Sequence, residues 1–349
     1  MRNRVRRWVV VAAAALTAAT SVAVASAAPA HGQPRAAAPC SPRLLVLSAF
    51  PTELGPLLAR TQPVGGVAVP VSGHTFYLGD IGGHHAVLAL TGIGPANARH
   101  TTRLALRHFR CGGRTSITGI VFSGVAGGDY IGDVNAATRW TEDGKHFVPV
   151  SKAMERVARR VQRAHHYRLS RDNHLGDPLC IHLNPAFGPA VTVSHVPTFK
   201  VGGTGLTTDP FGGKAFPCVP DAGDVFGCRP CQATNATPKD PLTVLQSLLP
   251  FANPSFFSSY FASESSPPGT YVSEDNETAE VAKTARAAGL PFIGFRGVSD
   301  GGGDPLHLPG YPFSFFVYRQ LSADNVGAVA ASFIRAWHDA SNVDPSMPN

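Results

Sequence analysis

Acidic residues gather at a few points of the 349-residue chain where they could do acid–base chemistry. Four carboxylates fall within residues 273–280, and Asp300 follows them after a helix-like stretch and an apolar run. Another acid, Glu53, comes shortly after the first apolar run of the chain. A carboxylate can accept hydrogen bonds from two neighbouring hydroxyl groups, and a protonated carboxyl group can act as a general acid. Glu53, Glu277 and Asp300 are therefore the candidate chemistry-bearing groups.

Short apolar runs alternate with helical patterns, and these elements must hold the acids in place. Strands are predicted over residues 44–49, 85–90, 117–122, 191–196 and 292–295. Helices are predicted from residue 52 and over 95–109, 151–167, 278–288 and 323–340. The alternation predicts the α/β class, a three-layer α/β/α fold with a central twisted sheet that is mostly parallel or mixed.

Ligands of such sheets bind beyond the carboxyl ends of the strands. Polar or glycine residues stand at four of these ends, and glycine lets a backbone approach a ligand closely. The four segments are Glu53, Thr91-Gly-Ile-Gly94, Ser123-Gly-Val-Ala-Gly-Gly128 and Ser299-Asp300. Their order along the chain predicts a single site at one edge of the sheet.

Together these segments resemble the nucleoside phosphorylase/nucleosidase superfamily, and most closely its 5′-methylthioadenosine/S-adenosylhomocysteine nucleosidase branch. The resemblance covers residues 44–133 and 276–300 and is poor from about 200 to 270. It rests on Ser48-Ala-Phe-Pro-Thr-Glu53, on the glycine turns, and on Asn276-Glu277 at a preserved spacing from Arg296-Gly-Val-Ser-Asp300. It implies a nucleoside phosphorylase-like fold in a single domain over residues 43–345.

The resemblance also implies roles for individual residues. Glu53 would activate the attacking water, Asp300 would protonate N7 of a purine, and Glu277 would bind the ribose hydroxyls. We expect the pKa of Asp300 to be raised by burial and by the two glutamates. The remaining substrate-binding positions are Thr91, Gly92, Ser123, Gly124, Asn276, Arg296 and Ser299. Two of these have open alternatives: Arg296 could pair structurally with a carboxylate, and Ser299 could only orient Asp300.

Two features depart from the family pattern. Asn276 stands where the family has Met, and the segment Gly203–Asp209 supplies no aromatic residue to stack on a base. Phe199 or Phe211 could provide that ring instead. The other acids of the opening cluster, Glu274, Asp275 and Glu280, are interpreted as solvated residues that favour the start of a helix.

The sequence therefore predicts a nucleosidase that hydrolyses the N-glycosidic bond of a purine-type nucleoside, without a cofactor or a metal. Phosphorolysis needs cationic groups around phosphate, and residues 50–55, the turn after the first strand, contain none. Two alternatives stay open: a phosphorolytic nucleoside phosphorylase, and a non-catalytic nucleoside-binding or storage-like protein of the same fold. The expected partner is a small-molecule nucleoside, and a homodimer is compatible with the sequence.

The first 27 residues read as a secretory signal peptide. Four Arg precede an apolar, Ala-rich run, and Ala25-Ser-Ala27 fits a cleavage site, so the protein is expected to be secreted. Residues 28–42 are predicted to be a flexible segment. Because residues 1–27 hold four Arg and no acid, the whole-chain charge of +7 falls to about +3 after cleavage. That charge is too small to indicate nucleic acid or membrane binding.

Six cysteines in an exported chain indicate disulfides. Zinc binding by Cys228-x-x-Cys231 is the alternative, but no second cysteine pair stands at the usual spacing. Cys40 and Cys111 each precede a predicted strand and form the preferred pair. The other four are predicted to pair among themselves. They would pin a Gly/Pro-rich insertion over about 200–270, which could be a lid or a plain surface loop.

Overall fold

The computed structural model describes residues 41–173, 191–220, 223–230 and 269–343. Its centre is a 12-stranded sheet in which β10-β9-β14-β15-β7-β1-β4-β3-β2 are neighbours, while β16 pairs with β7 and β8, and β13 pairs with β8. The strands of this sheet are β1 (Arg43–Ser48), β2 (Gln62–Val71), β3 (His74–Ile81), β4 (His84–Leu90), β7 (Ile117–Tyr130), β8 (Val134–Ala136), β9 (Arg139–Thr141), β10 (Phe147–Pro149), β13 (Phe199–Val201), β14 (Thr204–Thr207), β15 (Ser273–Asp275) and β16 (Phe292–Gly302).

Two short sheets and six helices complete the described elements. The strand pairs are β5 (Arg110–Cys111) with β6 (Arg114–Thr115), and β11 (Asp172–Asn173) with β12 (Val191–Thr192). The helices are α1 (Pro51–Leu58), α2 (Pro95–His108), α3 (Lys152–Ala164), α4 (Gly223–Phe226), α7 (Thr278–Ala287) and α8 (Phe313–Val343). Within these ranges, no helix has both the length and the apolar character needed to cross a bilayer.

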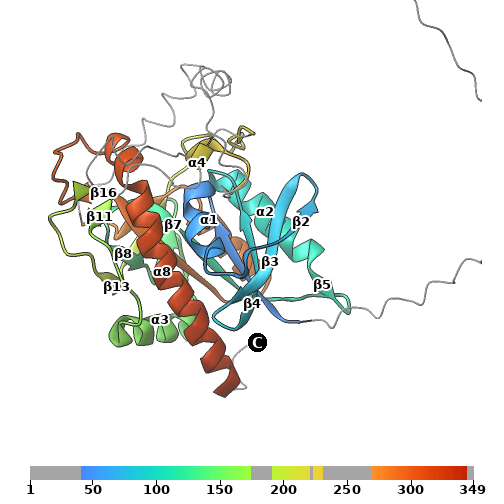
Figure 1. Cartoon of the computed structure of the whole chain (residues 1–349). Coiled ribbons are helices and arrows are strands. Elements are labelled where there is room, and N and C mark those ends of the chain that lie inside the picture. The colour runs from blue at the N-terminus through green and yellow to red at the C-terminus, as the bar shows by residue number, and fades with distance from the viewer. Residues whose placement is uncertain (1–40, 174–190, 221–222, 231–268, 344–349) are drawn as a thin grey trace, which may run out of the picture. The chain divides into compact units, whose positions relative to one another are not determined.

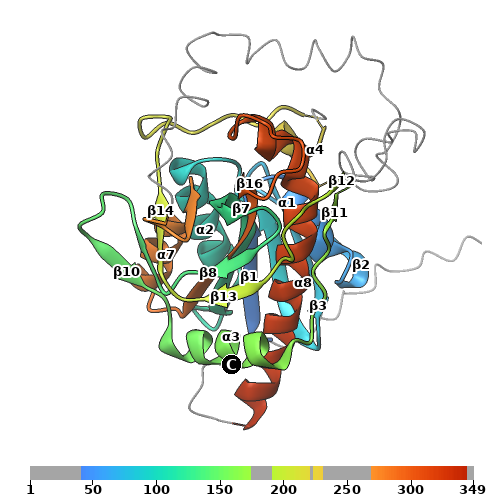
Figure 2. The same ribbon diagram turned by 90° about the vertical axis from the view of Figure 1, so that its left-hand side faces the viewer.

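The middle of the sheet is parallel and buried on both faces. β1 pairs in parallel with β4 and β7, and β16 pairs in parallel with β7. Side chains alternate across a strand, so Leu45 and Leu47 of β1 face one core cluster, while Leu44 and Val46 face the other. The first cluster includes α2 and α7, and the second includes α1, α3 and α8. Figure 2 shows β1 between α2 and α7 on one side and α1 and α8 on the other, as expected of a three-layer fold.

The sheet is mixed rather than purely parallel. β2, β3 and β4 pair antiparallel, and the β2–β3 hairpin was not predicted because Gly and Pro interrupt its first strand. β7 also runs straight through the segment Ser123–Gly128, which we expected to be a turn. The predicted strand over 191–196 shortens to β12, and the last helix begins at Phe313 instead of residue 323. In Figure 1, α8 is the long red helix at the C-terminal end of the described chain.

The insertion predicted from about residue 200 begins later. β13 and β14 belong to the central sheet, so the sheet continues to Thr207. Beyond it, Cys218 and Cys228 form a disulfide, as expected for pairing among the later cysteines. Cys111 is also disulfide-bonded, while its predicted partner Cys40 lies outside the described residues, as do Cys180 and Cys231.

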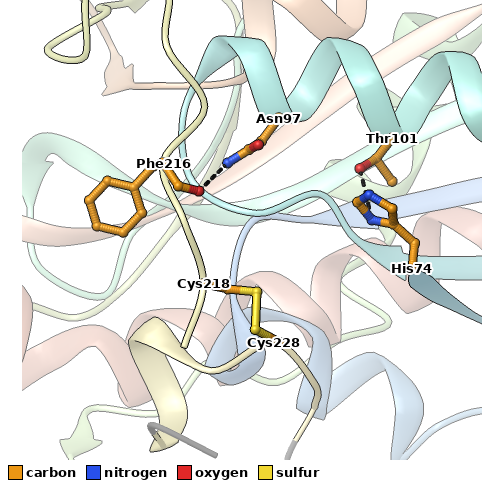
Figure 3. The surroundings of a disulfide bond; sticks show 6 residues. All are labelled: His74, Asn97, Thr101, Phe216, Cys218 and Cys228. Carbon is orange, nitrogen blue, oxygen red and sulfur yellow. Dashed lines mark hydrogen bonds between the residues drawn. A yellow bond between two sulfur atoms is a disulfide. The ribbon is translucent and has the colours of Figure 1, made fainter. Parts of the chain in front are cut away.

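The disulfide-bonded segment packs against helices that carry the site described below. Asn97 of α2 donates a hydrogen bond to the backbone oxygen of Phe216 at 2.6 Å, as Figure 3 shows beside the disulfide. Thr52 of α1 donates to the backbone oxygen of Asp224 at 2.7 Å. The Asp224 side chain forms a buried ion pair with Arg319 of α8 at 2.6 Å. The segment therefore ties α1, α2 and α8 together.

Candidate active site

A pocket of about 750 Å³ lies beyond the carboxyl ends of β1, β7 and β16. Glu53, Glu277 and Asp300 all line it, as do Asn276 and Ser299, so the structure brings together five of the predicted site residues. The other described residues of its wall are Phe50, Ile93, Val125, Ala126, Gly127, Gly128, Asp129, Tyr130, Thr208, Gly269, Tyr271, Glu274, Asp275, Gly301, Gly302, Gly310, Tyr311 and Phe315.

Glu53 lies in the first turn of α1 and is buried. The backbone N–H of Ala49 donates to its Oε2 at 2.6 Å, and that of Val125 donates to its Oε1 at 2.7 Å. Burial raises the pKa of Glu53 to about 7, although Arg296 and the backbone N–H groups act in the opposite direction. The carboxyl group is therefore fixed in orientation and titrates near neutral pH.

Glu277 immediately precedes α7 and is also buried. The backbone N–H of Gly94 donates to its Oε1 at 2.8 Å, and Arg296 Nη2 lies 3.3 Å from its Oε2. Burial raises the pKa of Glu277 to about 8; Arg296 opposes this shift, and the nearby Asp275 and Glu53 add to it. The glycine turn expected at the ribose site thus contributes a backbone donor that holds this glutamate.

Arg296 is fully buried and joins the acids from behind the pocket wall. Its Nε lies 2.7 Å from Asp275 Oδ2, and its Nη1 lies 3.6 Å from Glu53 Oε1. The guanidinium carbon stands 4.3 Å above the ring of Phe122. Since Arg296 does not line the pocket, the structure supports the alternative in which it pairs with carboxylates, rather than direct substrate contact.

Asp275 is the residue of this network that the sequence interpretation got wrong. It is buried, not solvated, and its Oδ1 accepts hydrogen bonds from Thr207 Oγ1 at 2.6 Å and from the backbone N–H of Glu277 and Thr278, both at 3.1 Å. It therefore caps α7 as well as binding Arg296. Glu280 is also buried, where it pairs with Arg99 and Lys283, and Glu274 lines the pocket.

Gly124 is required by the same network. A Cβ atom at this position would overlap Arg296 Nη1 and lie 2.5 Å from Glu53 Oε1. The predicted substrate-binding role of Gly124 is not seen, because the residue lies behind the wall of the pocket. Its place in the motif is explained by the close packing of a guanidinium and a carboxylate against the backbone of β7.

Asp300 stands near the end of β16, on the wall of the pocket. Ser299 Oγ donates to its Oδ1 at 2.8 Å, and Asp300 Oδ2 would lie 2.7 Å from a Cβ added at Gly127. Burial raises the pKa of Asp300 to about 6; the Ser299 hydrogen bond opposes this, and Glu274 adds to it. The expected direction is confirmed, but the contributing acid is Glu274 instead of Glu53 or Glu277.

Besides Arg296 and Gly124, three predicted binding residues lie outside the pocket wall: Thr91, Gly92 and Ser123. Thr91 is buried, and its Oγ1 donates to the backbone oxygen of Gly92 at 2.7 Å. Ser123 is buried too, where its backbone oxygen accepts a hydrogen bond from Ser48. From the Thr91-Gly-Ile-Gly turn, it is Ile93 that lines the pocket. The motif locates the turn, and the structure shows which of its residues face the pocket.

The aromatic residues suggested for base stacking are not in the pocket. Phe199 is buried in the core against Tyr167 and Phe295, and Phe211 packs against Phe216. The aromatic residues that do line the pocket are Phe50, Tyr130, Tyr271, Tyr311 and Phe315. They are contributed by several separate segments, and no local pattern of the sequence connects them.

The charge of the pocket wall is one-sided. Among the described residues that line it, six are acidic and none is Lys, Arg or His. Within the same described ranges, no three His, Cys, Asp or Glu side chains are arranged to hold a metal ion. The arrangement offers carboxyl groups that titrate near neutral pH on a pocket large enough for a nucleoside, which suits acid–base cleavage of a glycosidic bond.

Comparison with known sequences finds relatives for much of the chain. The family described as Phosphorylase superfamily matches residues 43–171. The uncharacterized protein Rv2293c of Mycobacterium tuberculosis is 40% identical over 199 residues, which are 55% of this chain and 78% of that protein. A second uncharacterized protein of that organism, Rv2292c, is 54% identical over 63 residues, 18% of this chain and 85% of its own length.

Solved structures share the fold. A 5′-methylthioadenosine/S-adenosylhomocysteine nucleosidase from Colwellia psychrerythraea, in complex with adenine, aligns with a TM-score of 0.52 at 15% identity, covering 85% of this chain and 96% of that one. The nucleosidase of the same name from Neisseria meningitidis, in complex with methylthio-immucillin-A, aligns with a TM-score of 0.51 at 17% identity, covering 84% and 99%. At these identities the likeness is one of fold.

Proposed function

The chain belongs to the phosphorylase superfamily, and we propose that it is a nucleosidase that hydrolyses the N-glycosidic bond of a purine-type nucleoside. The superfamily fold supports a nucleoside-processing activity. The finer proposal rests mainly on one observation: Glu53, Glu277 and Asp300, which are far apart in the sequence, line the same pocket. The reaction requires an acid, a base and a group that binds the ribose hydroxyls, and carboxyl groups can fill all three roles.

Asp300 is the proposed general acid. Its pKa of about 6 keeps a substantial fraction of the carboxyl group protonated in mildly acidic to neutral solution. A protonated Asp300 donates to a ring nitrogen of the leaving base, so the base departs without a full negative charge. Ser299 holds the carboxyl group in position through its 2.8 Å hydrogen bond.

Glu53 is the proposed base for the attacking water. Each of its oxygens already accepts one backbone N–H, and the remaining lone pairs can accept a proton from water. With a pKa of about 7, the carboxyl group is ionised in about half of the molecules at neutral pH. Glycoside hydrolases likewise use a pair of carboxyl groups, one as acid and one as base or nucleophile, on either side of the bond that is cleaved.

Glu277 is the proposed ribose-binding group. Its two oxygens are oriented by Gly94 and by Arg296, which leaves further lone pairs for the vicinal hydroxyls of a ribose. In its ionised form, which becomes the main one above its pKa of about 8, Glu277 also stabilises the positive charge that develops on the sugar as the glycosidic bond breaks.

The charge of the pocket favours hydrolysis over phosphorolysis. Phosphate is bound in proteins by Arg and Lys side chains, and the described residues of the pocket wall include neither. The nearest guanidinium, that of Arg296, is already engaged by Asp275 and Glu277. Six acidic residues on the wall would repel a phosphate dianion.

We also propose that the protein is exported. The predicted signal peptide lies outside the described residues, and the support comes from the disulfide between Cys218 and Cys228. Disulfides persist in oxidising compartments and are rare in the reducing cytosol. A pairing of Cys228 with Cys218 also leaves its sulfur unavailable for the zinc alternative.

The proposal is tested by incubating the purified chain with adenosine, inosine, guanosine and 5′-methylthioadenosine and measuring release of the free base by chromatography. Glu53→Gln and Asp300→Asn serve as controls that remove the proposed base and acid. Release of a purine base by the parent, lost in both variants, supports the nucleosidase. Saturable binding of a nucleoside without base release would contradict it and favour the non-catalytic binding protein.

A further inference from the structure

Tyr130 occupies a distinctive place on the pocket wall. It is the last residue of β7 and is 46% exposed, unusually open for a tyrosine that packs on neighbouring backbone. In the sheet, Asp300 is in register with Gly127, and Gly302 is in register with Tyr130. Both Tyr130 and Asp300 line the pocket. The ring therefore stands at the same end of the β7–β16 pair as the proposed acid.

Glycine backbone lies beside one edge of this ring. A Cβ atom added at Gly302 would lie 3.4 Å from Tyr130 Cδ1, and one added at Gly303 would lie 3.7 Å from the same atom. A Cβ atom at Gly301 would collide with the backbone oxygen of Gly128. The three glycines after Asp300 thus keep the ring close to the backbone and the pocket wall free of side chains.

A second ring holds Tyr130 from behind. The imidazole of His195 stacks on it, with ring centroids 4.6 Å apart and planes 22° apart. His195 Nε2 lies 2.8 Å from Asp133 Oδ1. Asp133 is buried and is itself fixed by the backbone N–H of Thr198 at 2.7 Å and by Lys200 Nζ at 3.0 Å. His195 and Asp133, together with the Thr198 and Lys200 groups that hold Asp133, have no role in the catalytic proposal, and their contacts fix the orientation of one exposed ring.

We propose that Tyr130 is the aromatic wall on which the base of the substrate stacks, and that His195, anchored by Asp133, positions it. The inference rests on the proposed nucleosidase function and assigns a stacking ring that the segment Gly203–Asp209 does not supply. Tyr130 contributes binding energy because it contacts the base, whereas His195 acts through Tyr130. A flat purine fits such a wall, since aromatic rings stack on every base face and prefer offset, near-parallel arrangements.

The test uses the full chain and the nucleoside that it cleaves fastest among adenosine, inosine, guanosine and 5′-methylthioadenosine. Tyr130→Ala is expected to raise KM, and the dissociation constant of the free base, by about 5- to 150-fold, the range of one base–aromatic stack. Tyr130→Phe should stay close to the parent. The matched control is Phe147→Ala, which removes an exposed ring that does not line the pocket.

Two variants of His195 separate positioning from general structural support. His195→Phe keeps a ring behind Tyr130 and should hold KM within about threefold of the parent. His195→Gln keeps a donor for Asp133 but no ring, and should raise KM by about 2- to 12-fold with little change in kcat. The opposite order would mean that the hydrogen bond, not the stack, matters, and would overturn the role given to His195.

The outcomes distinguish this inference from the function on which it rests. Base binding by calorimetry is measured independently of turnover, and circular dichroism checks that each variant is folded. If the parent cleaves a purine nucleoside and Tyr130→Ala matches it within twofold in both KM and base affinity, the stacking wall is wrong and the nucleosidase stands. If the parent neither binds nor cleaves any purine compound, the proposed function fails and the inference fails with it.

Discussion

Arg296 Nε lies 2.7 Å from Asp275 Oδ2, and both side chains are buried. This ion pair places the guanidinium between Asp275 and the two glutamates of the pocket. Asp275 also caps α7, the helix that begins directly after Glu277. One carboxylate thus fixes both the guanidinium behind the pocket and the backbone of Glu277, the proposed ribose-binding acid.

Asp275→Asn should therefore destabilise the protein and reduce activity together. Breaking a buried ion pair typically costs about 3–5 kcal/mol of unfolding free energy, because the remaining charge stays buried without its partner. Denaturant unfolding followed by circular dichroism measures the change. The matched control is Glu280→Gln in α7, the helix that follows Asp275. Its partners Arg99 and Lys283 are 41% and 45% exposed, so less than about 1 kcal/mol is expected. Equal losses in the two variants would contradict the assigned role.

The prediction from sequence failed at Asp275 for a physical reason. An acid just before a helix is favoured there whether it is solvated or buried, and the distinction depends on a partner 21 residues further along the chain. Glu53, Glu277 and Asp300 were correctly expected on one pocket because each follows or flanks a strand of the sheet. Thr91, Ser123 and Gly124 were expected beside the ligand because a motif locates a turn without showing which of its residues face the cavity.

Asp300→Asn should lower kcat by about 10²–10⁴-fold while leaving the fold intact. The amide has the same shape but cannot deliver a proton, and general acid catalysis contributes about this factor, roughly 3–5 kcal/mol of barrier. Steady-state kinetics and a thermal melt of the same preparation provide the two readouts. Ser299→Ala, which removes only the hydrogen bond to the carboxyl group, should have a smaller effect. Turnover of Asp300→Asn within a few-fold of the parent would mean that the acid is misassigned.

Gly124→Ala should impair activity far more than its small size suggests. The added methyl group would overlap Arg296 and press on Glu53, so both side chains must move. Overpacking of a dense interior typically costs about 1–3 kcal/mol. We expect a lower melting temperature and a large loss of kcat, measured beside Gly294→Ala, where the nearest obstacle is a single methyl carbon of Thr278 at 2.9 Å. Full activity in Gly124→Ala would show that the close packing is not required.

Stability should fall as the pH rises from about 4.5 to about 8 and should level off above that. Burial raises the pKa of Glu53 and Glu277 from 4.5 to about 7 and about 8. Between about pH 4.5 and these folded-state values, the unfolded chain has released both protons while the folded state still holds them, so each rise in pH favours unfolding. Once both groups are ionised in the folded state as well, this dependence ends. Thermal melts across this range should show a falling melting temperature in the parent and a flatter curve in Glu53→Gln. A melting temperature that rises over this range would contradict the raised pKa values.

The central strands of the sheet were easier to predict than the outer ones. The core strands β1, β4 and β7 are continuous apolar runs, a pattern that parallel strands buried on both faces produce. Nothing comparable marks the hairpin of β2 and β3, whose Pro and Gly residues are typical of loops. β13 and β14 are too short to show an alternating pattern of apolar and polar residues. Only their pairing with β8, β9 and β15 defines them as part of the sheet. The irregular composition after residue 200 concealed these two strands.

The fate of the ribose tests the central claim most directly. The parent protein is incubated with the nucleoside that it cleaves fastest, once in phosphate-free buffer and once with added inorganic phosphate, and the sugar product is identified by mass spectrometry. Hydrolysis predicts free ribose, or the free 5-modified ribose, at the same rate in both buffers. A reaction that depends on phosphate and yields ribose 1-phosphate would contradict the account and make the protein a phosphorylase.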